Sequence, residues 1–145
     1  MAHHLEGNKA IAERFAEEWN KGNLEGALAL IDENVVDHNP APGQAPGLAG
    51  ARQALTAFRT AFPDLKFTTE YVLADGDRVV DHGTARGTHK GNLFGIAATN
   101  KPVEFTYTDI YRIANGKIAE IWHIEDIAMA MQQIGAMKVP VGVSA

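Results

Sequence analysis

The stretch Asn115-Gly-Lys-Ile-Ala-Glu-Ile-Trp-His-Ile-Glu-Asp126, near the end of the chain, carries most of the information about the fold. Asn-Gly is the strongest short signal for a tight β-hairpin turn, and the run rich in Ile and Trp after it predicts a strand. That strand holds three carboxyl groups and a histidine, which is unusual for a strand that packs on a core.

Regular alternation along this strand places acidic and apolar residues on the same face. One face then holds Ile118, Glu120, Trp122, Ile124 and Asp126, and the other holds Ala119, Ile121, His123 and Glu125. Carboxyl groups beside Trp and Ile are solvated at the strand ends, paired in the core, or directed into a cavity. In a cavity their pKa values shift and they become useful for proton transfer. The strand pattern alone leaves these interpretations open.

Three further long strands are predicted upstream, over residues 65–73, 78–88 and 103–113. Asp75-Gly76 and Asn115-Gly116 are hairpin signals between neighbouring strands. The order of these segments predicts consecutive antiparallel strands.

Helical periodicity dominates the first part of the chain. Residues 8–20 place Ile11, Phe15 and Trp19 on one face, and Asn23 can cap a second helix over residues 24–31. A short extended piece then leads into a proline-rich loop, and a third helix is predicted over residues 50–62. The sum is an α+β fold, a curved antiparallel sheet wrapped around N-terminal helices with a central pocket. We expect one domain over residues 8–137, a disordered or non-native segment over residues 1–7, and a flexible tail over residues 138–145.

Composition excludes several functional classes. The 145 residues carry a formal net charge of −5 without a cluster of Lys and Arg, so nucleic acid and anionic membranes are poor candidates as partners. The absence of cysteine excludes disulfides, thiol nucleophiles and thiolate metal sites. No apolar run approaches the length of a membrane span, and we expect a cytoplasmic protein.

Acid–base chemistry is what the remaining residue types support. The only serine, Ser144, lies in the tail, and no glycine pattern matches a phosphate-binding loop. His38, His82, His89 and His123 lie on four separate segments without a metal-ligand spacing, so we expect no metal and no organic cofactor. Carboxyl groups and histidines that transfer protons are then the candidates.

Each candidate also has a purely structural interpretation. His82 shares a strand face with Thr84 and Arg86, a pattern that also fits a solvated sheet face. Tyr107 shares a face with Phe105, Asp109 and Tyr111, which also fits the edge of a core. His38 could instead cap the proline-rich loop.

Several runs together resemble the SnoaL-like polyketide cyclases, also called ester cyclases. They are Val36-Asp-His-Asn-Pro40, Gly87-Thr-His-Lys-Gly91 with Phe94-Gly95, Asp109-Ile-Tyr-Arg-Ile113 with Asn115-Gly-Lys-Ile118, Glu120-Ile-Trp122, Asp126, Gln133 and Gly135. The resemblance extends from the first helix to about Met137. It implies the cone-shaped fold shared with scytalone dehydratase and ketosteroid isomerase, and a homodimer that packs through the sheet.

The resemblance also implies site residues. In these cyclases an aspartate on the last strand is the general acid–base of an intramolecular aldol closure, and Asp126 matches it. His38 and Asn39 correspond to groups that hold the substrate carbonyls, while His82 stands where many relatives have arginine or another polar residue.

We therefore expect an enzyme that acts on a small hydrophobic carbonyl compound, with Asp126 and His38 as catalytic residues. The expected substrate-binding residues are Asn39, Phe58, Phe62, His82, Tyr107, Glu120 and Trp122. An apolar wall would raise the pKa of the acting carboxyl group. Alternatives are an epoxide hydrolase with paired acids, an isomerase or dehydratase, and a ligand-binding dimer without turnover.

Overall fold

The fold is taken from a computed structural model, which describes residues 4–138. Its elements are α1 (Leu5–Asn20), α2 (Leu24–Leu28), β1 (Ile31–Asp37), α3 (Gly47–Ala61), β2 (Lys66–Asp75), β3 (Arg78–Thr88), β4 (Pro102–Ala114), β5 (Lys117–Glu125) and α4 (Ile127–Gln133). The predicted α+β class is confirmed. Within residues 4–138, no helix has both the length and the apolar character needed to cross a membrane.

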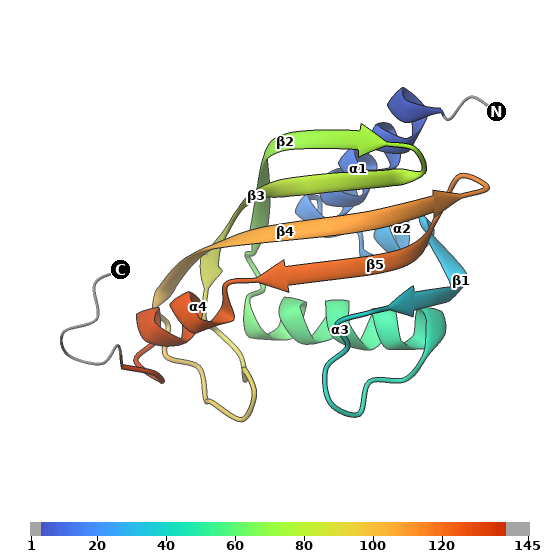
Figure 1. The fold of residues 1–145 in the computed structure, drawn as a ribbon. Helices are drawn as coiled ribbons and strands as arrows, with labels where there is room; N and C mark the ends of the chain where they lie inside the picture. The colour runs from blue at the N-terminus through green and yellow to red at the C-terminus, as the bar shows by residue number, and fades with distance from the viewer. Residues whose placement is uncertain (1–3, 139–145) are drawn as a thin grey trace.

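The five strands form one sheet in the order β1-β5-β4-β3-β2 (Figure 1). Strands β2 to β5 are antiparallel neighbours, as predicted. Strand β1 pairs in parallel with β5, so the sheet is mixed rather than wholly antiparallel. This pairing brings the segment before the proline-rich loop next to the last strand.

The hairpin between β4 and β5 follows the sequence signal. Asn115 and Gly116 have φ values of 52° and 75°, so both lie in the left-handed region. Two such residues match the twist of the flanking strands, and Asn-Gly tolerates this conformation best. The predicted turn is confirmed.

Two helix boundaries differ from the prediction. Helix α1 begins at Leu5, ahead of the predicted start at residue 8. Helix α2 ends at Leu28, and Ile31 begins β1 instead of completing that helix. The Leu30 carbonyl accepts a hydrogen bond from the Ile118 N–H (2.9 Å), so pairing with β5 prevails over local helical spacing. Residues 1–3 and 139–145 of the predicted terminal segments lie outside the described part of the chain.

Helices α1, α2 and α3 cover one face of the sheet, which we call the inner face. In Figure 1 α1 and α2 lie behind the strands, and α3 packs along β1. Trp19 of α1 is fully buried, and its indole N–H donates to the Leu65 carbonyl at 3.0 Å. The opposite, outer face exposes large apolar side chains, namely Val36, Tyr71, Leu73 and Ile124.

A β-bulge at Ala119 decides which side chains of β5 point inward. Ile113 pairs with Ile118 but Arg112 pairs with Glu120, which leaves Ala119 without a partner. One extra residue exchanges the two faces of a strand. The inner face of β5 therefore carries Ile118 and then Ile121, His123 and Glu125, while Glu120, Trp122 and Ile124 point outward. The regular alternation expected for this strand is wrong.

Candidate active site

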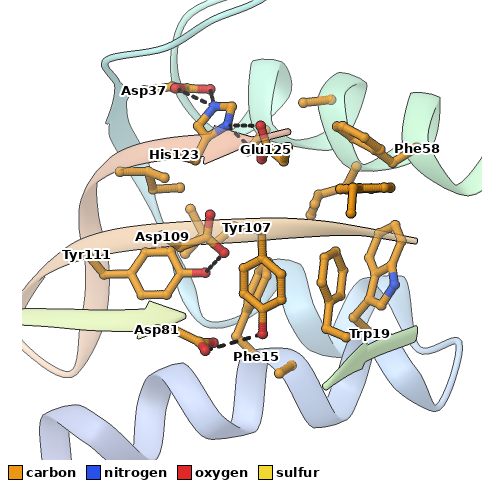
Figure 2. Close-up of a pocket in the computed structure, with 18 residues that line it drawn as sticks. Phe15, Trp19, Asp37, Phe58, Asp81, Tyr107, Asp109, Tyr111, His123 and Glu125 are labelled. Carbon is orange, nitrogen blue, oxygen red and sulfur yellow. Dashed lines mark hydrogen bonds and ion pairs between the residues drawn. The ribbon is translucent and has the colours of Figure 1, made fainter. Parts of the chain in front are cut away.

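A cavity of about 90 Å³ lies between the inner face of the sheet and helices α1 and α3 (Figure 2). One part of its wall is aromatic and apolar, formed by Phe15, Trp19, Phe58, Phe67, Phe105 and neighbouring aliphatic residues. The rest is titratable, formed by Asp37, Asp81, Tyr107, Asp109, Tyr111, His123 and Glu125. Apolar walls with a few convergent polar groups are typical of small-molecule sites.

The strand register explains why the titratable groups converge. Asp81 of β3 lies opposite Asp109 of β4, and Asp109 lies opposite His123 of β5. Side chains opposite one another in an antiparallel pair have Cβ atoms about 5 Å apart. The three residues therefore form a row across the sheet, and Asp37 of β1 continues it beyond His123.

His123 is held between two carboxyl groups. Its Nδ1 atom lies 2.9 Å from Oε1 of Glu125, and its Nε2 atom lies 3.0 Å from Oδ1 of Asp37. The remaining oxygen of Asp37 accepts a hydrogen bond from the Gln44 amide at 3.0 Å. The imidazole ring is therefore fixed from both sides, and Gln44 in turn orients Asp37.

The surroundings of His123 favour its protonated form. Burial alone would lower the pKa of this imidazole. The hydrogen bond with Glu125 and the charges of Glu125, Asp37 and Asp109 outweigh burial and raise the pKa to about 9. At neutral pH His123 is an imidazolium with a proton on each ring nitrogen.

Two phenol–carboxyl pairs lie beside this histidine. The Tyr107 hydroxyl donates to Asp81 at 3.3 Å, and the Tyr111 hydroxyl donates to Asp109 at 3.2 Å. Burial, reinforced by the charges of Glu125 and Asp81, raises the pKa of Asp109 to about 8. Burial also raises the pKa of Asp81. The cavity thus contains two carboxyl groups, Asp81 and Asp109, whose pKa values are raised by burial.

Comparison with known proteins assigns the chain to a family. The sequence model of the SnoaL-like polyketide cyclases matches residues 9–134. The chain belongs to the SnoaL-like polyketide cyclase family. No curated protein matches it in sequence.

Solved structures agree with this membership. The chain is 31% identical to a protein from Bacillus cereus titled a putative polyketide cyclase, with a TM-score of 0.75 over 88% of this chain and 80% of the other. It is 30% identical to IdmH from Streptomyces antibioticus, titled likewise, with a TM-score of 0.76 over 88% and 98%. AclR from Streptomyces galilaeus, titled a putative hydroxylase, shares the fold at 23% identity, with a TM-score of 0.82 over 94% and 91%.

Two residues expected at the SnoaL-like site line the cavity, Phe58 of α3 and Tyr107 of β4. Phe62 is fully buried and belongs to the core beside them. Asn39, expected to bind substrate, binds the main chain of β5. Its side-chain oxygen accepts a hydrogen bond from the backbone N–H of His123 at 2.9 Å. Asn39 therefore fixes the strand that carries His123.

Asp126 lies outside the cavity lining. It follows the end of β5 and caps α4, where its side chain accepts a hydrogen bond from the Met129 N–H at 3.0 Å. It lines a separate open hollow together with Glu125 and Tyr107. The carboxyl group expected against the apolar wall of Trp122 caps α4 instead, because Asp126 comes after the end of β5.

Four expected site residues lie on the outer face. His38 stacks on Trp122, with ring centroids 4.4 Å apart, and its Nε2 atom lies 2.9 Å from Oε1 of Glu120. Glu120 also pairs with Arg112. His82 is hydrogen-bonded to Thr108 at 2.7 Å. The structure thus gathers His38, Glu120 and Trp122 into one cluster, separated by the sheet from the cavity.

Asp37, His123 and Glu125 are not among the site residues that the sequence predicts. Alternation correctly places Asp109 and Tyr111 on the face of Tyr107, and His123 and Glu125 together on one face of the next strand. Only the register between these two strands shows that the two faces meet in one cavity. In residues 4–138, no group of three or more His, Asp or Glu side chains is arranged to hold a metal ion.

Proposed function

We propose that this SnoaL-like protein is an enzyme that transfers protons on a small hydrophobic carbonyl compound, in the manner of an intramolecular aldol closure. The observation that carries the proposal is His123, bound to Glu125 and Asp37 at its two ring nitrogens, in a cavity whose other wall is aromatic. Paired proton donors and acceptors in an apolar enclosure are the parts that this chemistry requires.

The proposed reaction begins at Glu125. Its carboxylate removes a proton from the carbon next to a carbonyl group, and the enolate carbon then attacks a second carbonyl carbon of the same molecule. A carbon–carbon bond forms, and the attacked oxygen takes the proton of the His123 imidazolium. Glu125 then passes the proton that it took from carbon to His123 across their 2.9 Å contact, so both side chains end as they began.

Asp37 acts as a positioning residue in this scheme. Its contact with Nε2 of His123 keeps the ring oriented and supports the imidazolium charge. Gln44 in turn holds Asp37 from the proline-rich loop. Positioned general acids and bases typically contribute about 10²–10⁴-fold to a rate.

The aromatic wall supports the choice of substrate. Phe15, Trp19 and Phe58 offer flat apolar surface, and the volume of about 90 Å³ suits a compact molecule. Burial of apolar substrate surface supplies binding free energy of about 25 cal/mol per Å². The carbonyl end of the substrate would lie against the titratable row.

An open-chain diketone with three methylene carbons between its carbonyl groups tests the proposal, because aldol closure gives a six-membered cyclic ketol. We expect the protein to accelerate ring formation, followed by NMR, and to accelerate deuterium uptake at the carbons beside the carbonyls. Deuterium uptake without ring formation would favour an isomerase-type reaction. The absence of both would contradict enzymatic proton transfer on this class of compound.

The family resemblance assigns catalysis to Asp126 and His38 instead, and that assignment stays a prediction. Asp126 caps α4 and His38 contacts Glu120. The same diketone assay on variants of these residues and of His123 distinguishes the two assignments.

A further inference from the structure

We infer that the end of the cavity beside α1 binds an ammonium group, with the carboxylate of Asp81 as its counter-ion and aromatic rings around it. The substrate of the proposed reaction is then an amino ketone, a compact carbonyl compound that also carries a protonated amine. The carbonyl part of this inference rests on the proposed function. The ammonium part is tested by binding alone and needs no turnover.

Asp81 of β3 is a buried carboxyl group that lacks a cation. It is 2% exposed, and its side chain lines the cavity. The Tyr107 hydroxyl donates to its Oδ1 atom at 3.3 Å, longer than the usual O–H···O range of about 2.5–3.0 Å. The charged groups that act on it are Glu13 of α1, which repels it, and His82, which is bound to Thr108 on the outer face. A buried carboxylate is costly without a cation, and an ammonium ligand would supply one.

The charge of the whole cavity also favours a cation. Four carboxyl groups line it, those of Asp37, Asp81, Asp109 and Glu125, against one imidazolium, His123. His123 already contacts Asp37 and Glu125. Among the described residues that line the cavity there is no Lys or Arg. Even with Asp109 neutral the acids outnumber the cation, so the cavity attracts cationic ligands and repels anionic ones.

Aromatic rings surround the same end of the cavity. Figure 2 shows Asp81 beside α1, close to Phe15 and Tyr107. Phe15 packs on Tyr111 with ring centroids 6.0 Å apart, and Phe67 packs edge-on against Tyr107 at 5.0 Å. The faces of aromatic rings attract organic cations. Rings and a carboxylate together therefore favour an ammonium group over a neutral group of the same size.

The strand register separates this ammonium subsite from the proposed reaction centre. Asp81 lies opposite Asp109, and Asp109 lies opposite His123, so Asp81 and His123 are two strands apart, or about 10 Å. Figure 2 shows these two side chains at opposite ends of the cavity. An ammonium group at Asp81 would anchor one end of the ligand while its carbonyl groups lie at His123.

Three single-ring probes test the preference for positive charge in the wild-type, full-length protein at pH 7. Benzylamine is protonated, benzyl alcohol is neutral and nearly the same size, and benzoate is an anion. We expect benzylamine to bind at least about 10-fold more tightly than benzyl alcohol, and benzoate to bind most weakly. Ligand-observed NMR measures all three. Benzyl alcohol or benzoate binding as tightly as benzylamine would overturn the inference.

Variants distinguish Asp81 from a general attraction of cations by an acidic protein. Asp81→Asn keeps the shape of the side chain and removes its charge, so benzylamine should bind at least about 10-fold more weakly while benzyl alcohol binds as before. Asp109→Asn in the cavity and Asp75→Asn on the exposed end of β2 each remove one carboxyl group and are matched controls. Both should keep most of the preference for benzylamine. An unchanged preference in Asp81→Asn, or its loss in Asp109→Asn alone, would overturn the inference.

A readout on the wild-type protein does not depend on the folding of any variant. In protein labelled with ¹³C at aspartate, the carboxyl signal of Asp81, assigned through its own backbone resonances, should shift with benzylamine and stay in place with benzyl alcohol. A benzylamine shift confined to other aspartates would overturn the inference. The diketone of the closure assay carries no amine, so failure of that assay would remove the proposed reaction and leave ammonium binding in place. Equal binding of the three probes would remove only the ammonium subsite.

Discussion

The Nε2 atom of His123 lies 3.0 Å from Oδ1 of Asp37, and this contact joins the last strand of the sheet to the first across 86 positions of the sequence. It depends on the parallel pairing of β1 with β5 and on the bulge that turns His123 inward. One hydrogen bond therefore reports on both the fold and the proposed site.

Stability should fall with rising pH, because His123 binds its proton more tightly in the folded state. Its pKa is raised from 6.5 to about 9, so the stabilisation is complete below pH 6.5 and is lost as the pH passes 9. Asp109, whose pKa is also raised, acts in the same direction. After allowance for partial exposure we expect a loss on the order of 1 kcal/mol, or about 2–4 °C in Tm.

Thermal unfolding followed by circular dichroism between pH 6 and pH 9.5 checks this prediction. His123→Gln is the control, and its melting temperature should change less over the same range. A wild-type melting temperature that rises with pH would contradict the raised pKa of His123 in the folded protein.

Gly83 should not tolerate a side chain, because it lies opposite Tyr107 in the sheet. A Cβ atom there would meet the Thr68 carbonyl oxygen at 2.1 Å and the Tyr107 hydroxyl at 2.8 Å. We expect Gly83→Ala to cost about 1–3 kcal/mol, measured by urea unfolding. Gly7→Ala in α1 is the control: its Cβ meets nothing closer than 3.7 Å, so it should be neutral or stabilising. Equal stability of the two variants would show that β3 can shift.

Self-association should involve the outer face of the sheet. Ile124 of β5 is 71% exposed and Leu73 of β2 57% exposed, and both point to this face, as do Val36 of β1 and Tyr71 of β2. Large apolar side chains exposed on one face are typical of interfaces. We expect a dimer of twice 15.6 kDa in sedimentation at micromolar concentration, and a monomer for Ile124→Lys. A wild-type protein that sediments only as a monomer would refute the prediction.

Local signals were sufficient to predict most of the elements. Apolar spacing predicted α1 and α3, and the turn residues Asn115 and Gly116 marked the last hairpin. Alternation also placed Tyr107, Asp109 and Tyr111 correctly on one face of β4. These features depend on residues close together in the chain.

The site depended on long-range relationships that local patterns do not contain. The bulge at Ala119 is visible only in the pairing of β5 with β4, and it moves Trp122 and Glu120 away from the cavity. The contact of Asp37 with His123 requires the parallel pairing of β1, which has no local signature. For these reasons the sequence pointed to His38 where the structure brings Asp37 to the cavity.

The measurement that tests the central claim most directly is the rate of diketone closure in His123→Gln and Asp126→Asn, compared with wild type. We predict that His123→Gln lowers the rate by about 10²–10⁴-fold while the protein stays folded, because its general acid is lost. Asp126→Asn should keep nearly the wild-type rate, since Asn also caps a helix well. A fully active His123→Gln together with an inactive, folded Asp126→Asn would contradict the account.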